Sequence, residues 1–206
     1  MSFPGLRLLA ARIPPRWEDA TPAWMSDAIA SRCPGARVAA LELVTRDDGT
    51  NRRACFALRY AAGAGPATVF LKAHSPHHRW VHLRNGNLFN EARLFACGVA
   101  LPVDHPLVYK AVVDRLRLDF LLVMEDLAQR GADPRDATRP LSVDQVAHGL
   151  RALARLHSAF WGFSGRTHPQ LGWVKTWRPT KGWQVGLRKR VPVGLQRGAG
   201  QLPAEV

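Results

Sequence analysis

A lysine and a glutamate nineteen positions apart have the residue types and placement needed for phosphate chemistry. Lys72 ends the apolar run 68–71, which has the length of a buried strand. Glu91 shares an i, i+3, i+4 helical spacing with Leu88 and Ala92, which predicts a carboxylate on the apolar face of a helix. Burial disfavours an unpaired ammonium group. We therefore predict an ion pair between Lys72 and Glu91.

The segments before Lys72 are predicted to form the sheet that holds it. Thr21 followed by Pro22 is typical of a helix N-cap and first helical position. Apolar and polar residues then alternate over 41–44 and 55–60, which indicates two strands. The turn-forming residues 47–51 join them. Together with the strand that ends at Lys72, they predict a three-stranded antiparallel meander.

Four histidines follow Lys72 in a stretch that is predicted to be a polar loop. They are His74, His77, His78 and His82. A metal site is one interpretation, but no cysteine or carboxylate joins them at ligand spacing, so a solvated loop is favoured. The helix that contains Glu91 is expected to have its N-cap at Asn85 or Asn87 and to end at Gly98.

The rest of the chain is predicted to add two strands and a long helix. Strand-like runs cover 107–113 and 119–123, and a polar, Pro-containing loop follows to residue 140. Ser142 and Gln145 form a capping box. The helix after it has one apolar face, predicted to be buried: Val143, Val146, Ala147, Leu150, Leu153, Ala154, His157 and Trp161. His157 is interpreted as a core histidine rather than a catalytic base.

The last forty-odd residues carry many basic side chains but no helical or strand period. We expect residues 162–206 to be poorly ordered by themselves. The formal net charge of the chain is +13, which suits a polyanionic partner. A nucleic-acid partner is not favoured, because the arginines are spread along the chain and no recognition motif accompanies them.

Composition fits a folded protein of one domain or two small lobes, with 206 residues of which 47% are hydrophobic. The cysteines Cys33, Cys55 and Cys97 are odd in number and form no C-x-x-C pair, so neither a disulfide framework nor a zinc site is expected. A reducing cytoplasm suits them best. No apolar run reaches membrane-spanning length, so no membrane span is expected.

Five ordered segments resemble one known family of enzymes. They are Asp48-Gly49-Thr50-Asn51-Arg52-Arg53, Val69-Phe70-Leu71-Lys72, Glu91-Ala92, Met124-Glu125-Asp126-Leu127 and Leu153-Ala154-Arg155-Leu156-His157. Over residues 38–161 the chain resembles the aminoglycoside phosphotransferase and choline or ecdysteroid kinase-like group. Members of that group are ATP-dependent small-molecule kinases with a protein-kinase-like fold of two lobes.

The resemblance implies a fold class and a division of the chain. The fold would be α+β, with a small lobe made of an antiparallel sheet and one helix, followed by the first helix of an incomplete large lobe. Residues 1–124 would be the nucleotide-binding lobe, 125–140 the hinge and linker, and 141–206 the start of the helical lobe.

The resemblance also implies roles for individual residues. Lys72 would contact the phosphates of ATP, and Glu91 would hold the lysine in place. The turn Gly49-Thr50-Asn51 would cover the nucleotide, although it lacks a full G-x-G-x-x-G pattern. The backbone of Met124, Glu125, Asp126 and Leu127 would form the hinge that meets adenine.

The sequence departs from the family after His157. Such kinases carry a catalytic loop of the form H-G-D-x-x-x-x-N and then a metal-binding aspartate. Here the only later histidine is His168, and residues 158–206 contain no aspartate. We therefore expect an N-terminal portion of a phosphotransferase that transfers no phosphate by itself, with the Mg²⁺ ligands in a missing C-terminal part and the small-molecule acceptor undefined.

Three alternatives stay open at this point. The chain could be a non-catalytic nucleotide-binding or scaffold protein, or a basic RNA-binding domain that uses its C-terminal segment. Lys72 and Glu91 could also be an ordinary partly buried ion pair of an α+β domain without a ligand.

Overall fold

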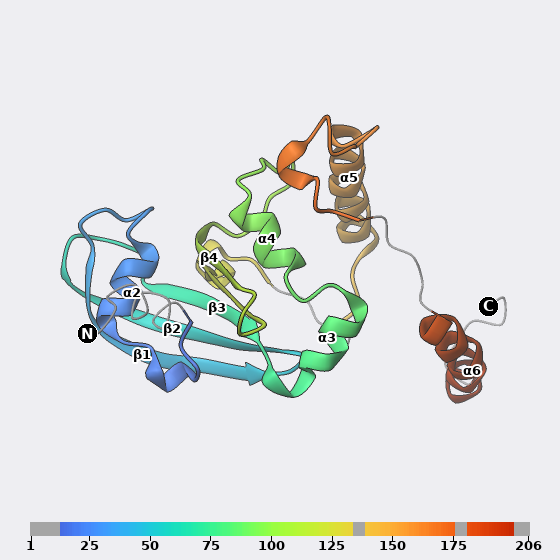
Figure 1. Ribbon diagram of the computed structural model, residues 1–206, viewed down its shortest axis with the longest axis horizontal. Coiled ribbons are helices and arrows are strands. Elements are labelled where there is room, and N and C mark those ends of the chain that lie inside the picture. Colours follow the sequence, from blue (N-terminus) through green and yellow to red (C-terminus); the bar gives the residue numbers. More distant parts are fainter. Residues whose placement is uncertain (1–12, 134–138, 176–180, 200–206) are drawn as a thin grey trace. The chain divides into compact units, whose positions relative to one another are not determined.

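The computed structural model describes residues 13–133, 139–175 and 181–199, which form an α+β architecture (Figure 1). The chain divides into two compact units, Met1–Gly172 and Trp173–Val206. The sheet and the helices packed on it belong to the first unit. The boundary between the two units falls after Gly172.

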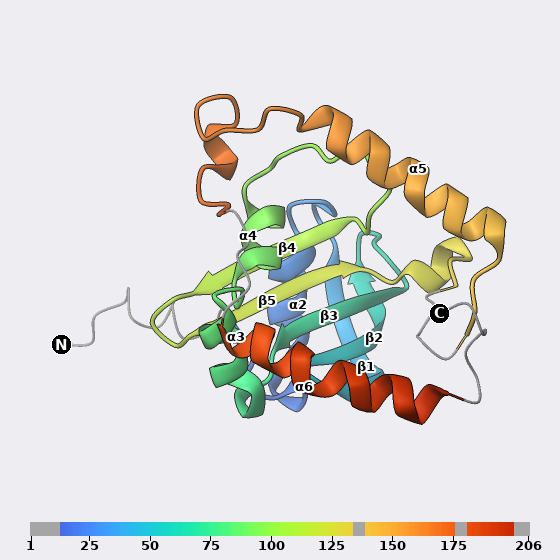
Figure 2. The same cartoon turned by 90° about the vertical axis from the view of Figure 1, so that its right-hand side faces the viewer.

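A five-stranded antiparallel sheet is the centre of the first unit. Its strands are β1 (Arg37–Asp48), β2 (Asn51–Ala62), β3 (Thr68–His74), β4 (Val108–Asp114) and β5 (Asp119–Glu125). They lie in the order β1-β2-β3-β5-β4, side by side in Figure 2. The predicted meander of the first three strands and the two later strands are confirmed.

The two edge strands of the sheet are irregular. β1 is twelve residues long and shifts register against β2 at three places, between Arg37 and Val38, between Val38 and Ala40, and between Leu43 and Thr45. β4, at the other edge, shifts once against β5. Such shifts are typical of β-bulges, which bend and twist a strand locally.

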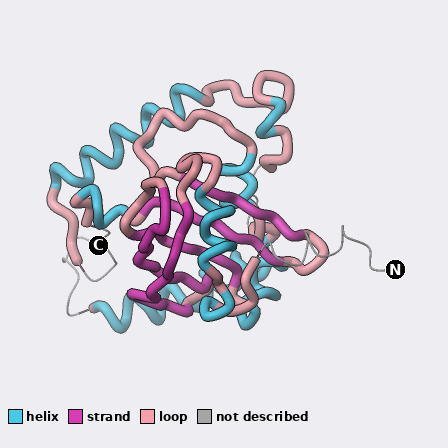
Figure 3. Tube along the Cα trace, turned by 90° about the vertical axis from the view of Figure 1, so that its left-hand side faces the viewer, coloured by secondary structure: helices cyan, strands magenta, loops and turns pink. Residues whose placement is uncertain are grey.

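Helix α2 (Pro22–Ile29) covers one face of the sheet (Figure 3). It begins as predicted, because the Thr21 side chain accepts a hydrogen bond from the Trp24 backbone N–H at 3.2 Å. The hydrophobic core between α2 and the sheet contains alternate residues of the strands, residues of α2, and residues of the segment that precedes α2. Its fully buried members include Trp17, Met25, Ile29, Val69, Leu71, Leu121 and Val123.

A buried arginine fixes the segment before α2 to the start of β2. Arg52 Nε donates to the His74 carbonyl at 3.1 Å, and its terminal nitrogens donate to the carbonyls of Pro14 and Pro15 at 2.8 and 2.7 Å. The guanidinium also lies 4.6 Å from the ring centre of Trp17. Each bond gives a backbone carbonyl a charged donor, which makes it stronger than a bond between neutral groups.

The opposite face of the sheet is covered by α4 (Asn90–Ala96), preceded by α3 (Arg79–Asn85). This second core consists of Leu88, Ala92, Phe120, Leu122 and Met124. Our N-cap prediction for α4 was wrong. Phe89 occupies that position without a side-chain hydrogen bond, because the chain enters α4 directly from the turn after α3. The prediction that the helix ends at Gly98 is confirmed: Gly98 follows the C-cap and has φ of +68°.

The histidine-rich stretch is helical, and the predicted loop is therefore wrong. Residues Pro76–His78 form a 3₁₀ turn, and α3 begins at Arg79. His74 is the last residue of β3 and is buried. Strand alternation does not explain this burial, because the preceding Ala73 is buried as well. The His74 side chain is covered because it packs beside Arg79 and His82.

Helix α5 (Val143–Ala159) begins with the predicted capping box of Ser142 and Gln145. The prediction that its apolar face is buried is wrong, since none of the helix residues is buried. Val143 is 85% exposed and Leu150 is 61% exposed. Helical spacing specifies which side chains share a face, but it does not provide a packing partner for that face.

The second unit contains α6 (Lys181–Gly198), where we expected no regular structure. Its leucine, arginine, lysine and glutamine residues favour the helix, whereas its glycines oppose it. Pro192 lies inside the helix and removes one hydrogen bond donor from it. The other residues of the stretch that we expected to be poorly ordered include 176–180 and 200–206, which lie outside the described part of the chain.

Candidate functional site

The predicted ion pair between Lys72 and Glu91 is confirmed. Lys72 Nζ lies 2.5 Å from Glu91 Oε2 and bridges β3 and α4. The lysine side chain is 20% exposed and the glutamate side chain 41% exposed. The pair is therefore only partly dry, and solvent can reach it from the glutamate side.

Strand alternation explains why Lys72 faces α4. Val69, Leu71 and Ala73 are buried on the α2 face of the sheet. Phe70 and Lys72 therefore point to the opposite face, where Phe70 packs into the second core. Glu91 lies in the first turn of α4, next to the buried Ala92, where a negative charge also interacts favourably with the helix dipole.

A second cation lies directly beside the lysine. Arg53 of β2 is the register partner of Lys72 in β3, so both side chains leave the same face of the sheet. Arg53 has its own acid, with Nη1 2.8 Å from Asp47 Oδ2 of β1. The site is thus a row of two ion pairs, Asp47 with Arg53 and Lys72 with Glu91. Sequence reasoning missed Arg53 as a site residue, although its two-residue offset from Cys55 on β2 would have placed it on this face.

The two other predicted segments flank Lys72 along β3. Asn51, the end of the predicted turn, is in register with His74, and Met124 is in register with Phe70. Lys72 lies between these two positions on the strand. The structure therefore brings the turn, the lysine and the hinge-like segment onto one part of the sheet.

The turn of residues 49–51 is held at its tip by a histidine of α3. His82 Nε2 donates to the Thr50 carbonyl at 3.2 Å, and its Nδ1 lies 3.2 Å from the side-chain amide oxygen of Asn87. At Gly49 an added side chain would meet no atom within 4 Å, so the turn backbone is open on that side. The Oδ1 atom of Asn51 is buried and has no hydrogen bond partner among the described residues.

The side chains of the hinge-like segment are engaged inside the protein. Glu125 accepts a hydrogen bond from the Leu107 N–H at 3.0 Å and pairs with Arg130 at 2.9 Å. Asp126 caps the 3₁₀ helix Leu127–Arg130 by accepting from the Ala128 N–H at 3.1 Å. Met124 is buried in the second core. A ligand at this segment would therefore meet backbone rather than these carboxylates.

Asp126 is also the centre of a small polar network at the start of β3. Its Oδ2 accepts from the Thr68 hydroxyl at 2.6 Å and lies 3.5 Å from the Cys55 Sγ. Gln129 donates to the same Thr68 hydroxyl at 2.5 Å. Burial, with the Asp126 carboxylate next, raises the pKa of the Cys55 thiol to about 11. Cys55 is therefore a protonated, unreactive thiol at neutral pH.

The histidines do not assemble with other ligands. Within residues 13–133, 139–175 and 181–199, no group of three His, Cys, Asp or Glu side chains could hold a metal ion. Burial, and then the charge of Arg79, lower the pKa of His74 to about 4. Its ring is neutral at physiological pH, and its Nδ1 has no hydrogen bond partner in the described part of the chain.

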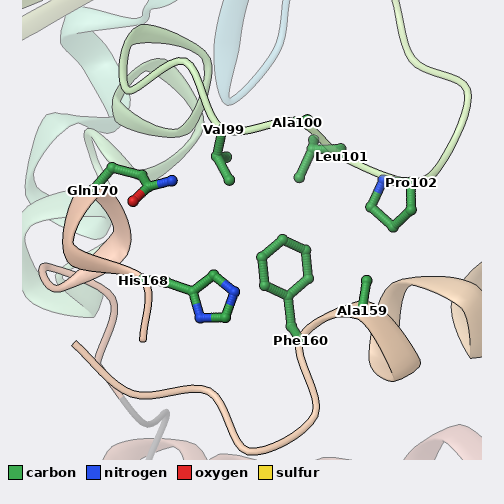
Figure 4. A pocket seen from close by; sticks show the side chains of 8 residues that line it. All are labelled: Val99, Ala100, Leu101, Pro102, Ala159, Phe160, His168 and Gln170. Carbon is green, nitrogen blue, oxygen red and sulfur yellow. The ribbon is translucent and has the colours of Figure 1, made fainter. Parts of the chain in front are cut away.

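A pocket of about 360 Å³, whose lining includes none of the residues of the two ion pairs, lies between the loop after α4 and the end of α5 (Figure 4). Its lining is Val99, Ala100, Leu101, Pro102, Ala159, Phe160, His168 and Gln170. The His168 ring packs on Phe160 and Phe163, and its Nδ1 is 3.0 Å from the Thr167 hydroxyl. No titratable partner accompanies His168 in this lining, so the pocket has no acid–base pair.

Comparison with known proteins gives no match: no family model, no curated protein and no solved structure matches the chain. In the described residues, no helix is both long enough and apolar enough to cross a bilayer.

Proposed function

We propose that the first unit binds a nucleoside triphosphate, ATP above all, as the small lobe of a kinase-like phosphotransferase. The observation that carries this proposal is the Lys72 to Glu91 pair between β3 and α4, which solvent reaches from the glutamate side. A lysine held by a helix carboxylate is the arrangement that kinases use to position the phosphates of ATP.

The neighbouring cation supports the same ligand chemistry. Like charges placed directly opposite each other on adjacent strands repel. Lys72 and Arg53 occupy such positions and are each balanced by a single carboxylate. A polyphosphate carries enough negative charge and enough acceptor oxygens to bridge both cations without breaking the flanking pairs.

Phosphate transfer is not part of this proposal. The residues after His157 supply no H-G-D motif, and residues 158–206 contain no aspartate to hold Mg²⁺. Binding by this chain would therefore be weak, because no carboxylate-bound metal neutralises the phosphates. We expect no turnover of ATP by the purified chain.

Binding of a fluorescent ATP analogue, with competition by ATP, ADP and AMP, tests the proposal. We expect Lys72→Met to raise Kd by at least about tenfold, because one charge-assisted contact to phosphate is lost. Lys110→Met is the matched control, since Lys110 also lies on a strand, β4, but forms no ion pair with the described residues. AMP should compete least, because it lacks the β- and γ-phosphates.

Two results would refute nucleotide binding at this site. One is the absence of saturable ATP binding at millimolar concentration. The other is an equal loss of affinity in the Lys72→Met and Lys110→Met variants, which would show diffuse attraction to a basic chain. Circular dichroism of each variant excludes unfolding as the cause.

A further inference from the structure

Helix α6 carries a strongly one-signed charge. Its basic side chains at 188, 189, 190 and 197 are all exposed, and no aspartate or glutamate occurs between residues 181 and 198. No acid within the helix can therefore balance these cations by an i, i+4 pair. A surface of this kind attracts an anionic partner.

The same helix presents an apolar stripe. Leu187, Val191 and Leu195 recur at every fourth position, so they lie on one side of the helix. They are 49%, 50% and 50% exposed. Trp183 precedes them by one more turn and extends the stripe to about 18 Å at 1.5 Å per residue.

Basic residues flank this stripe on both sides. With about 100° of rotation per residue, Arg188 lies about 20° beyond Leu195 and Arg190 about 20° before Trp183 around the helix axis. An apolar strip between two basic margins matches the boundary between acyl chains and anionic headgroups. The apolar side chains would enter the boundary, and the guanidinium groups would meet the phosphates and carboxylates above it.

We propose that α6 binds peripherally to membranes that contain anionic lipids. A nucleic acid would satisfy the arginines equally well, but it offers no apolar layer for Leu187, Val191 and Leu195. No helix in the described residues is long and apolar enough to cross a bilayer, so α6 would lie on the membrane surface rather than span it. This inference is independent of nucleotide binding by the first unit.

Co-sedimentation of the full chain with vesicles tests the proposal. The two lipid compositions are phosphatidylcholine alone and phosphatidylcholine with about 30% phosphatidylserine, both in about 0.1 M salt. We expect the anionic lipid to tighten binding by at least about tenfold, because each basic residue near a charged surface adds a favourable contribution. Equal binding to the two compositions would overturn the proposal.

Two pairs of variants separate the charge and the apolar stripe. The triple variant Arg188→Glu, Lys189→Glu, Arg190→Glu should lose binding. The control variant Arg32→Glu, Arg37→Glu, Arg59→Glu changes the net charge by the same amount at exposed positions of the first unit. This control should keep vesicle binding. Likewise, the double variant Leu187→Ser, Val191→Ser should bind the anionic vesicles at least about tenfold more weakly. The control variant Val146→Ser, Leu150→Ser replaces two apolar residues of α5 that are also exposed, and it should keep vesicle binding.

Each of the other outcomes contradicts the proposal. If both charge variants lose binding equally, attraction is a property of the whole basic chain. If the Leu187→Ser, Val191→Ser variant keeps full binding, the apolar stripe has no role. If a short DNA duplex binds more tightly than the anionic vesicles and competes with them, α6 is a nucleic-acid surface. Circular dichroism confirms that each variant keeps its helix content.

Discussion

Removing the charges of Lys72 and Glu91, singly and together, measures how much the central ion pair contributes. The variants are Lys72→Met, Glu91→Gln and the double substitution. Two unit charges 2.5 Å apart attract by about 1.7 kcal/mol at a dielectric constant of about 80 and by about 6.6 kcal/mol at about 20. Desolvation and the ordering of both side chains offset most of that attraction.

We expect a coupling energy of about 1 kcal/mol. The lysine is mostly buried, so the coupling energy of this pair should lie at or above the upper end of the range for fully exposed pairs, which is about 0.2–1 kcal/mol. The glutamate is 41% exposed, so the coupling falls below that of a dry pair. Each single variant leaves one charge unpaired, and the two single losses should therefore add up to more than the loss in the double variant.

Urea denaturation of the four proteins at low salt and at about 1 M NaCl provides the assay. The coupling should shrink at high salt, because the exposed side of the pair is screened. Additive effects within error at low salt would refute the reasoning and would show that the two side chains meet without stabilising the fold. A coupling well above about 3 kcal/mol would show that the site is drier than its exposure indicates.

Three further predictions concern buried groups outside the ion pair. Arg52→Met should lower the free energy of unfolding by about 3 kcal/mol in urea melts, because three backbone carbonyls lose their donor, while the exposed control Arg59→Met should change it little. The pKa of His74 is lowered from 6.5 to about 4, so the unfolded chain binds a proton that the folded chain does not, and stability should fall as pH falls from 6.5 to 4. His74 changes the free energy of unfolding by at most about 1.4 kcal/mol per pH unit. In urea melts between pH 4 and 6.5, His74→Gln should remove this contribution. The control His105→Gln should leave it in place. Cys55 should react with iodoacetamide at about pH 8 at least about 100-fold more slowly in the folded chain than in urea, since its pKa of about 11 leaves little thiolate; equal rates by mass spectrometry would contradict this.

Local signals predicted most of the sheet and its first helix. The Thr21-Pro22 start of α2 and the turn between β1 and β2 depend on residues next to one another, and both form as predicted. The Lys72 to Glu91 pair also followed from local patterns, because alternation on β3 and the helical face of α4 each direct one charge inward. The assignment of these residues to ATP remains a prediction.

The errors concern partners that are distant in sequence. Nothing next to His74 shows that Arg52 and Arg79 pack around it, so its polarity alone favours a solvated loop over a buried strand end. The same alternation that points Phe56 and Leu58 inward also points Arg52 inward, and this signal could have identified the buried arginine. On α5, the capping box predicted the start of the helix, but a one-sided apolar pattern contains no information about what covers it.

The irregular edges of the sheet affect how this chain behaves at high concentration. A twelve-residue edge strand such as β1 offers a row of unpaired backbone groups on which a second chain could align. Its three register shifts break that row into short pieces, and Arg46, Asp47 and Asp48 place charges of both signs at one end. Straightening β1 by deleting one residue at the Leu43/Thr45 shift would remove part of this protection. Fibril formation, followed by thioflavin fluorescence, would then be faster than in the natural chain.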